Sequence, residues 1–370
     1  MVCGELGVYR EECGILIKYY MFKKKMVQAL NISGNPNISV IIVIYNQKQY
    51  LESCIESIFA QELDFEIIII DNSSTDGSYE FIKGKYPKIR IFRNLENIGY
   101  AAANNFGVKM AKGEIVVIIN PDTKVGKKWL ITLIKPLLKH DKLITTSKIL
   151  MYDGSKINTC GNKIHFSGLA FTNGFGQNPS AFSTSFFVEG ISGCCFAMKK
   201  YNYFEIGGFN ENFFLYSEDT EFSWKLHLMN YRIKLVTESI VYHDYHLKLS
   251  AQKLYNLEKG RYLILREMLN LNDIFLLSPS LLIIEILTLI FSFNFGIVGV
   301  EKKIFAIRDS FNIKIEKIQG NKQNLINNFC YTIPSHLGIE KKHEEVVKKI
   351  LNVIFETNGI FLKKFYRLGD

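Results

Sequence analysis

The chain has 370 residues, which fits about two domains of ordinary size. Apolar residues make up 48% of it and charged residues 22%, which excludes a disordered chain and a coiled coil. Lys and Arg number 45 against 36 Asp and Glu. The resulting net charge of +9 suits an anionic partner, such as a sugar nucleotide, an anionic membrane face or a nucleic acid.

The seven cysteines are odd in number and form no Cys-x-x-Cys pair. This pattern argues against a disulfide framework and against a structural zinc site, and it indicates a reducing compartment. Residues 1–36 lack an apolar core followed by a small-residue cleavage site, so we expect no signal peptide there. We treat 1–36 as an N-terminal extension.

Strands and helices alternate over residues 37–255. Runs rich in Ile and Val are typical of strands buried on both faces. Strands are predicted at 38–46, 65–71, 88–94 and 114–122. Helices are predicted at 47–61, where apolar residues recur on one face, and at 99–113. Four strands separated by helices predict an α/β fold with a mostly parallel central sheet and right-handed crossovers.

Residues 256–370 have a different character, because the 26 residues 275–300 carry a single charge, Glu285. A transmembrane helix needs about 20 apolar residues, but a mid-membrane carboxylate is costly. Pro279 and Gly296 could break the run into a shallow hairpin or interfacial helices, and a buried helical subdomain is a further alternative. Flanking cations favour the membrane. They are Lys302, Lys303, Arg308 and Lys314. We predict a C-terminal helical region that associates with a membrane.

Polar side chains follow every predicted strand. In an open parallel sheet, ligands bind beyond the carboxyl ends of the strands. Helix caps use the same residue types, but four such ends converging on one edge favour a ligand site. The residues in question are Tyr45, Asn46, Asp71, Asn72, Ser73, Asn97, Gly99, Asn104, Asn120, Pro121 and Asp122.

The usual glycine-rich phosphate cradles are missing from the sequence. No Gly-x-Gly-x-x-Gly follows the first strand, and no Gly-x₄-Gly-Lys-Ser/Thr occurs. A nucleotide bound here would therefore need another neutraliser for its phosphates, either a divalent metal or a Lys/Arg clamp. Asp122 at a strand end is a hard oxygen ligand suited to Mg²⁺ or Mn²⁺.

Several longer motifs carry a family resemblance over about residues 38–265. They are VIIVIYN, IIIIDNSSTDGS, NLENIGYAAANNFGVKMAKGEIVVIINPD, VEGISGCCFAMKK, GGFNENFFLYSEDTEFSWKL and VYHDYH. On these motifs the chain resembles an inverting glycosyltransferase of family 2 with the GT-A fold. It is similar to the rhamnosyltransferase-like branch that builds surface polysaccharides.

The resemblance implies a nucleotide pocket and a metal site. Asp71 corresponds to the acid that contacts the nucleotide base, and Tyr45 and Asn46 line the same pocket. The segment beside the ribose and base is represented by Asn97, Gly99 and Asn104. The triplet Asn120-Pro121-Asp122 occupies the position of the metal-binding Asp-x-Asp motif, with Asn120 in place of the first Asp. Asp122 keeps the position that touches the metal.

The resemblance also implies the catalytic groups. Glu218-Asp219 matches the acidic pair in which the Asp is the general base, although both acids also suit a helix N-terminus. A single displacement at the anomeric carbon needs such a base, because the attacking hydroxyl must lose its proton. His243 is either a metal ligand or a structural histidine. Arg261 is either a diphosphate clamp or an exposed helix cation.

The implied function is transfer of a sugar from a dTDP-, UDP- or GDP-sugar to a lipid-linked or polysaccharide glycan acceptor. This would take place at the cytoplasmic face of the cell membrane, in cell-envelope polysaccharide biosynthesis, with the enzyme attached peripherally, monotopically or by one transmembrane segment. The alternative is a catalytically weakened, membrane-anchored sugar-nucleotide-binding or scaffold protein, which only Asn120 favours. We expect no nucleic-acid partner, because the basic residues are scattered and no nucleic-acid-binding signature occurs. The implied division is 1–36, a GT-A domain at 37–255 and the helical region at 256–370.

Overall fold

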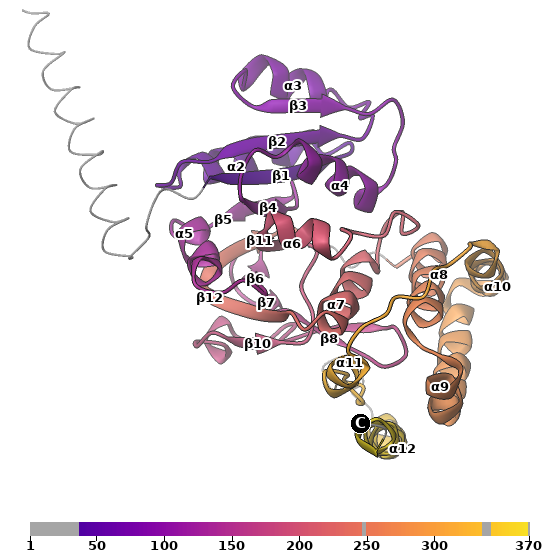
Figure 1. Ribbon diagram of the computed structural model, residues 1–370. Helices are drawn as coiled ribbons and strands as arrows, with labels where there is room; N and C mark the ends of the chain where they lie inside the picture. The colour runs from indigo at the N-terminus through magenta and orange to yellow at the C-terminus, as the bar shows by residue number, and fades with distance from the viewer. Residues whose placement is uncertain (1–36, 246–248, 335–341, 369–370) are drawn as a thin grey trace, which may run out of the picture.

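The computed structural model describes residues 37–245, 249–334 and 342–368. The N-terminal extension expected at 1–36 lies outside these residues. A central sheet carries helices on both faces, and a group of long C-terminal helices packs beside it (Figure 1).

The first half of the main sheet is parallel. Its strands are β1 (Ile38–Ile44), β2 (Glu66–Asp71), β3 (Arg90–Arg93) and β4 (Ile115–Ile119). They lie in the order β4-β1-β2-β3, and every neighbouring pair is parallel. All four predicted strands are confirmed, each within a few residues of the expected bounds.

The second half of the sheet is mixed. Its strands are β5 (Thr123–Val125), β6 (Leu143–Met151), β7 (Ile157–Thr159), β10 (Phe186–Val188), β11 (Cys195–Lys199) and β12 (Arg232–His243). β11 lies antiparallel between β4 and β6, whereas β12 is parallel to β6. A separate ribbon pairs β8 (Asn162–Ile164) with β9 (Ala170–Thr172). The expected α/β class with a mostly parallel sheet is confirmed, and the antiparallel strands β5, β7, β10 and β11 are the additions.

Helices cover both faces of the sheet. They are α2 (Lys48–Phe59), α3 (Ser78–Lys85), α4 (Tyr100–Met110), α5 (Trp129–Ile134), α6 (Lys200–Glu205) and α7 (Glu218–Leu228), with short 3₁₀ turns η1 (Lys135–Leu138) and η2 (Pro179–Ala181). Val40 and Ile42 of β1 join one apolar cluster with α2, α3 and α5. Ile41 and Val43 join a second cluster with α4, α6 and α7. This alternation buries β1 on both faces, as its β-branched run predicts.

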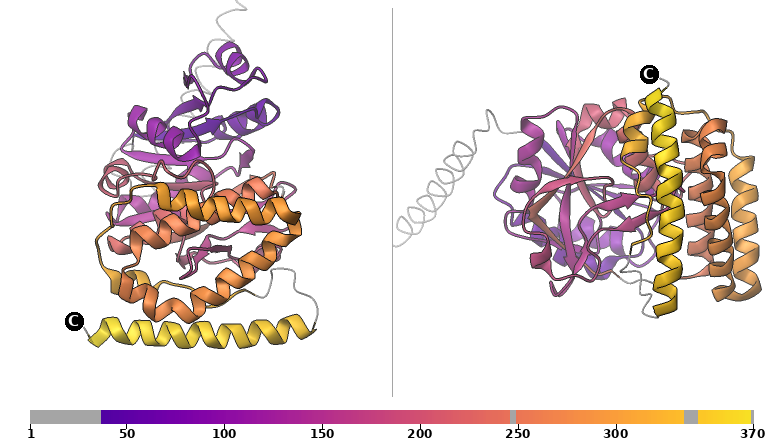
Figure 2. Two further views of the ribbon diagram at one scale, coloured as in Figure 1. Left: turned by 90° about the vertical axis from the view of Figure 1, so that its right-hand side faces the viewer. Right: turned by 90° about the horizontal axis from the view of Figure 1, so that it is seen from below.

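Long helices dominate the C-terminal part. They are α8 (Ala251–Met268), α9 (Leu271–Ser292), α10 (Gly296–Asn312), α11 (Lys322–Asn327) and α12 (Lys342–Leu368), with the 3₁₀ turn η3 (Phe293–Phe295) between α9 and α10. Figure 2 shows α12 lying beside α9 along one side of the molecule. A third apolar cluster joins α8, α9 and α12 to Trp224 of α7. Because α8 runs across residue 255, the division at that point stays a prediction.

The apolar run 275–300 breaks near its end rather than at its proline. Pro279 lies inside α9, and the helix ends at η3, where Gly296 adopts a φ of +64°. The segment Leu271–Asn312 contains an 18-residue window with a mean hydropathy of 2.4, of which 17% is buried. By length and composition this helix could cross a membrane, which leaves a span and an interfacial hairpin both open at this stage.

Glu267 of α8 gives the fold a testable pH dependence. Its side chain is buried beside Asn210, and burial together with the Glu221 carboxylate raises its pKa to about 8 from an ordinary value of 4.5. The pKa of Glu267 is thus higher in the folded state than in the unfolded state. The contribution of this carboxyl to the free energy of unfolding is therefore fully present below pH 4.5 and is lost as the pH rises through 8. We expect Glu267→Gln to raise the melting temperature above pH 8 and to change it little below pH 4.5.

The measurement is thermal unfolding at both pH values. The matched control is Glu316→Gln, because Glu316 is an exposed acid at the same cleft. An equal shift of the melting temperature at the two pH values would contradict the raised pKa of Glu267.

Candidate active site

The residues predicted from the sequence gather where the parallel strands end. The loops after β1, β2, β3 and β4 meet the C-terminal end of β12 and the N-terminus of α7 along one edge of the sheet (Figure 1). Hydrogen bonds join these loops in pairs, and together they form three groups of polar side chains. The groups are centred on Asp71, on Asn120 with Asp219, and on Asp122.

Asp71 lies at the end of β2 with its carboxylate already paired. Its Oδ1 accepts a hydrogen bond from the Ser74 amide at 3.1 Å, and Arg93 Nε lies 3.2 Å from its Oδ2. Arg93 also donates to the Ser74 carbonyl at 2.7 Å. The sequence analysis missed Arg93, although its position at the end of the neighbouring strand β3 was a usable signal.

Asn46 ties the loop after β1 to the loop after β2. Its side-chain Oδ1 accepts a hydrogen bond from the Thr75 backbone amide at 2.7 Å, and its backbone amide donates to Ser74 Oγ at 3.0 Å. Asn46 has a φ of +52°, a region where Asn is one of the few tolerated side chains. The neighbouring Tyr45 ring is 47% exposed, so it offers an open aromatic face beside the loops.

Asn97 and Gly99 shape the turn into α4. The Gly99 amide donates to Asn97 Oδ1 at 3.0 Å, and Gly99 has a φ of +86°. A Cβ on Gly99 would lie 2.5 Å from the carbonyl oxygen of Phe214, which itself accepts from the Tyr100 amide. Asn104, one turn along α4, is buried and donates to the Tyr100 carbonyl at 2.9 Å. These side chains therefore fix the position of Tyr100.

The Asn120 motif and the acidic pair meet at Gly193. The Tyr100 hydroxyl lies 3.0 Å from Asn120 Oδ1 and 2.8 Å from the Gly193 carbonyl. The Gly193 amide donates to Asp219 Oδ2 at 3.1 Å, and Asn162 Nδ2 lies 3.3 Å from the same oxygen. Gly193 lies in the turn that precedes β11, and Gly190 forms an isolated bridge with Asn162.

Burial sets the electrostatics of the acidic pair. Glu218 and Asp219 open α7, and the residue before them, Ser217, has a φ of +69°, a strained conformation for Ser. Burial raises the pKa of both carboxyls, and the adjacent Asp219 charge raises the pKa of Glu218 further. Both acids lie in the first turn of α7, as a helix N-terminus favours, and the role of Asp219 as general base stays a prediction.

Asp122 faces His243 at the end of β12. Asp122 Oδ1 lies 3.3 Å from His243 Nε2, and His243 Nδ1 lies 3.1 Å from Asn158 Oδ1. In the tautomer in which Nδ1 donates to Asn158, the bare Nε2 faces the carboxylate, and a cation between them would relieve this repulsion. A carboxylate oxygen and an imidazole nitrogen are ligands that Mn²⁺ accepts. Among residues 37–245, 249–334 and 342–368, no group of three His, Cys, Asp or Glu side chains surrounds a metal position.

Arg261 does not reach this edge. Its guanidinium is buried against Glu258 and Glu285 in the C-terminal helices. Both expectations for Arg261, a diphosphate clamp and an exposed helix cation, are therefore wrong.

Comparison with known proteins relates two parts of the chain to known families. Residues 39–204 match the family described as glycosyl transferase family 2, and residues 174–248 match the family described as the N-terminal domain of galactosyltransferase. Residues 39–204 are therefore similar to family 2 glycosyltransferases, which is the family that the motifs resemble.

Curated relatives match parts of the chain. Glycosyltransferase GlyG of Streptococcus pneumoniae is 33% identical over 125 residues, which are 33% of this chain and 42% of the relative. Poly-beta-1,6-N-acetyl-D-glucosamine synthase of Staphylococcus aureus is 30% identical over 223 residues, which are 59% of this chain and 52% of the relative. The chain thus spans about half the length of these relatives.

Solved structures confirm the fold. GalNAc-T7 with UDP, GalNAc and Mn²⁺ has a TM-score of 0.55 at 19% identity, and the match covers 67% of this chain and 51% of that one. S. aureus TarS 1-349 in complex with UDP has a TM-score of 0.51 at 16% identity, over 90% and 92%. The expected GT-A fold is confirmed. None of these four proteins is named for a rhamnosyl donor, so that branch stays a prediction.

We expect Gly99→Ala to destabilise the protein more than Gly207→Ala does. Both glycines have a φ of +86°, so both substitutions strain the backbone, but only at Gly99 would the new Cβ meet a backbone oxygen at 2.5 Å. At Gly207 nothing lies within 4 Å. Urea unfolding of the two variants measures the difference. Equal destabilisation would show that Phe214 moves away freely.

Proposed function

We propose that this chain is an inverting glycosyltransferase that moves a sugar from a nucleotide-diphosphate sugar to a hydroxyl of a lipid-linked or polysaccharide glycan acceptor. The observation that carries the proposal is the position of Gly193, whose carbonyl and amide link the Asn120 motif to Asp219. This link supports a site in which the two motifs act on one substrate. The names of the relatives support the same reaction class.

Asp219 is the proposed general base. As the acceptor oxygen bonds to the anomeric carbon, the bond to the leaving diphosphate breaks and the hydroxyl proton passes to the Asp219 carboxylate. Asp219 Oδ2 accepts from the Gly193 amide and from Asn162, and Oδ1 accepts from the Thr220 hydroxyl at 3.3 Å. Burial raises the pKa of Asp219, which makes it a better proton acceptor. Glu218 is the proposed catalytic neighbour, and the Asp219 charge together with burial raises the pKa of Glu218.

Asp122 and His243 are the proposed holders of Mg²⁺ or Mn²⁺. Mg²⁺ is commonly held by one or two protein carboxylates together with substrate phosphates and water, so a two-residue site is sufficient. When bound, the ion would supply positive charge to stabilise the departing diphosphate. Asn120 contributes no charge, and its proposed role is to keep Tyr100 in place near the donor.

The remaining predicted residues would bind the nucleotide. Tyr45 would stack on the base, and Asn46 and Asp71 would line the same pocket, with Arg93 shared between Asp71 and the ligand. Asn97, Gly99 and Asn104 would act through the shape of the turn beside the ribose. The donor base and sugar, rhamnose included, are open choices within this proposal.

The proposed location is the cytoplasmic face of the cell membrane, in cell-envelope polysaccharide synthesis. One helix long and apolar enough to span a membrane supports attachment. We propose residues 37–255 as the catalytic domain and 256–370 as the membrane-associating region. A weakened binding or scaffold protein is the second candidate, because Asn120 replaces one carboxylate charge at the metal motif.

A thermal-shift screen tests the proposed function. UDP-, dTDP- and GDP-sugars, dTDP-rhamnose among them, are each added with Mn²⁺, since a ligand that binds only the folded state raises the melting temperature. Turnover of any donor that binds is then measured. A shift without turnover favours the scaffold candidate, and no shift with any donor contradicts both.

We expect Asp219→Asn to lower turnover by roughly 10²–10⁴-fold, because loss of a general base typically has that effect. Donor affinity should change little, since the amide keeps an oxygen facing the Gly193 amide. Turnover and donor affinity are measured on the same preparation. Asp141→Asn is the matched control, because Asp141 is exposed and lies before the amino end of β6. Turnover within a few-fold of wild type would remove Asp219 from the role of base.

Activity should require Mg²⁺ or Mn²⁺, and Asp122→Ala should weaken donor binding in the presence of metal. The reason is that no glycine-rich cradle neutralises the phosphates of the donor. Donor affinity is measured with metal and with excess EDTA. Full activity in EDTA would refute the metal assignment, and unchanged metal affinity in His243→Ala would make His243 a structural residue.

A further inference from the structure

One face of α9 is buried along the full length of the helix. The buried residues recur at helical spacing from its first turn to its last. They are Asp273, Leu277, Ser280, Ile284 and Ser292. The rest of the protein therefore packs against α9 along its whole length.

Polar contacts tie α9 to the body at separate points. In the first turn, Asp273 accepts from the Tyr366 hydroxyl at 2.5 Å and lies 3.2 Å from Lys322 Nζ. In the next turns, Asn358 of α12 bonds the Ser280 hydroxyl and also donates to the Leu276 carbonyl. These partners come from α11 and α12, so α9 cannot leave them without exposing buried polar groups.

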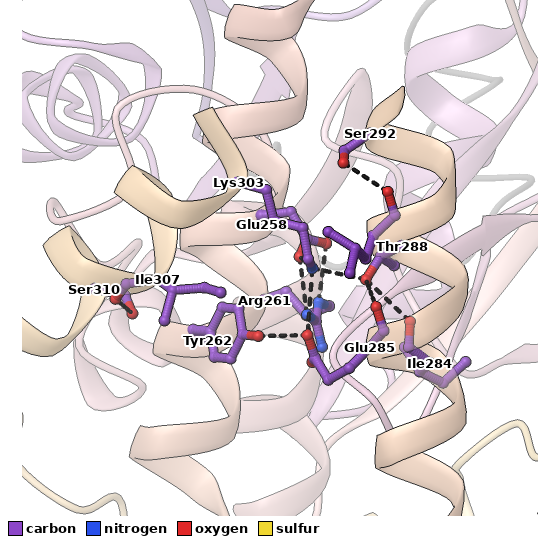
Figure 3. Close-up of polar contacts among 11 residues, drawn as sticks. Glu258, Arg261, Tyr262, Ile284, Glu285, Thr288, Ser292, Lys303, Ile307 and Ser310 are labelled. Atoms are coloured by element: carbon purple, nitrogen blue, oxygen red, sulfur yellow. Dashed lines mark hydrogen bonds and ion pairs between the residues drawn. The ribbon is translucent and has the colours of Figure 1, made fainter. Parts of the chain in front are cut away.

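A cluster of four charges holds the middle of α9. Figure 3 shows Glu285 of α9 meeting Glu258 and Arg261 of α8 and Lys303 of α10. Arg261 Nη2 lies 2.6 Å from Glu285 Oε1 and 2.9 Å from Glu258 Oε2. Lys303 pairs with both glutamates, and the Tyr262 hydroxyl donates to Glu285 at 2.5 Å. Two acids and two bases balance, so this buried cluster is close to neutral.

These contacts decide whether α9 crosses the membrane or lies in the plane of its surface. A helix that crosses the hydrocarbon core would carry its partners with it, including the charged groups of α8 and α10. Separating Glu285 from Arg261 and Lys303 instead would leave Glu285 without a partner. The two cations would then share Glu258 alone, so one positive charge would stay buried and unbalanced, which is strongly unfavourable. The helix therefore keeps one face on the protein and turns the other outward.

The outward faces of three helices are apolar, and together we call them the apolar face. On α9, η3 and α10 it includes Leu271, Phe275, Leu282, Ile290, Phe293 and Ile297. On α12 it includes Val346, Ile350, Val353, Ile360, Phe361 and Phe365. α9 and α12 contact each other, so the helices that carry the two sets lie side by side (Figure 2). So extensive an exposed apolar surface is typical of a binding face rather than of a free surface.

Charge identifies what covers the apolar face. The last turns of α12 carry Lys363, Lys364 and Arg367, and between Glu356 and the end of the helix at Leu368 there is no acid. Tyr366 places this basic end against the start of α9, next to exposed apolar residues. A second copy of the chain would bring equal charges to its own partner copy, whereas anionic lipid headgroups complement them. We propose that the apolar face docks flat on an anionic lipid membrane, with α9 in the plane of the interface and not across the bilayer.

Flat docking brings the proposed catalytic acids close to the lipid surface. Gly260 of α8 packs against Ser217, where a Cβ would lie 2.6 Å from the Ser217 Cβ. The next residue, Arg261, belongs to the charge cluster that holds α9. α8 thus connects the docked helix to the N-terminus of α7. A lipid-linked acceptor would fit this geometry, and that part of the inference rests on the proposed function.

Vesicle binding tests the charge and apolar components. The full chain is floated with phosphatidylcholine vesicles, with and without phosphatidylglycerol. We expect binding to the anionic vesicles, and Lys364→Gln and Arg367→Gln should each weaken it about fivefold. Lys83→Gln and Lys88→Gln, exposed and remote in α3 and its following loop, are the matched controls. Phe275→Asp should abolish binding, whereas Phe187→Asp on β10 should not.

Labelling of single cysteines tests the orientation. Asn272→Cys and Asn294→Cys place thiols near the two ends of α9, outside the residues named for the apolar face. A membrane-impermeant maleimide is applied to intact cells and to lysed cells, with the parent chain as background. Flat docking predicts that neither site is labelled in intact cells and that both are labelled after lysis. Labelling of one end alone in intact cells would show a span and overturn the proposal.

Two further outcomes would also overturn it. One is a failure to bind anionic vesicles, and the other is a stable dimer that buries Phe275 without lipid. Neither assay involves sugar transfer, so their failure leaves the transferase proposal standing. In the same way, a failed donor screen leaves the docking proposal standing.

Discussion

The candidate site depends on one short turn, in which both the carbonyl and the amide of Gly193 form hydrogen bonds with side chains of the site. Its carbonyl faces the Tyr100 hydroxyl and its amide faces Asp219, so the strand-end motif and the helix that carries the acids hold a fixed relation. The turn precedes β11, which lies antiparallel between β4 and β6. The mixed sheet therefore serves the site directly, because an antiparallel strand starts at the edge where its parallel neighbours end.

The molecule contains two kinds of buried charged groups, those paired with opposite charges and those without such a partner. In the C-terminal helices, Glu258 and Glu285 are matched by Arg261 and Lys303, and the cluster is a structural tie. At the start of α7, Glu218 and Asp219 have no cation beside them in the part of the chain that the structure describes, and their pKa values are raised. Buried acids without a neighbouring cation, at the polar end of a sheet, are typical of functional sites. Buried acids that are paired with cations are typical of structural packing.

The sequence predicts the parallel half of the sheet well, because β1, β2 and β4 are runs rich in Ile and Val with a polar residue at or just after their ends. It also indicates which residues approach the site, since Asn46, Asp71, Asp122 and Asp219 follow such ends or open a helix. It does not predict Asn162 or Tyr100, whose relevance comes from partners far away in the chain. Glu285 shows the same limit: its cost in an apolar run is visible, but Arg261 and Lys303 lie on other helices.

The proline in α9 has a consequence for the backbone of that helix. Pro279 has no N–H, so the carbonyl of Phe275 loses its usual helical donor. The Ser278 hydroxyl donates to that carbonyl at 2.8 Å and replaces the missing bond. Hydrocarbon offers no hydrogen bonds, so a bare carbonyl on the outer side of α9 would be expensive there and harmless in water. The dipeptide Ser278-Pro279 thus makes this turn of the helix self-sufficient, and its main chain can face a solvent that contains no donors.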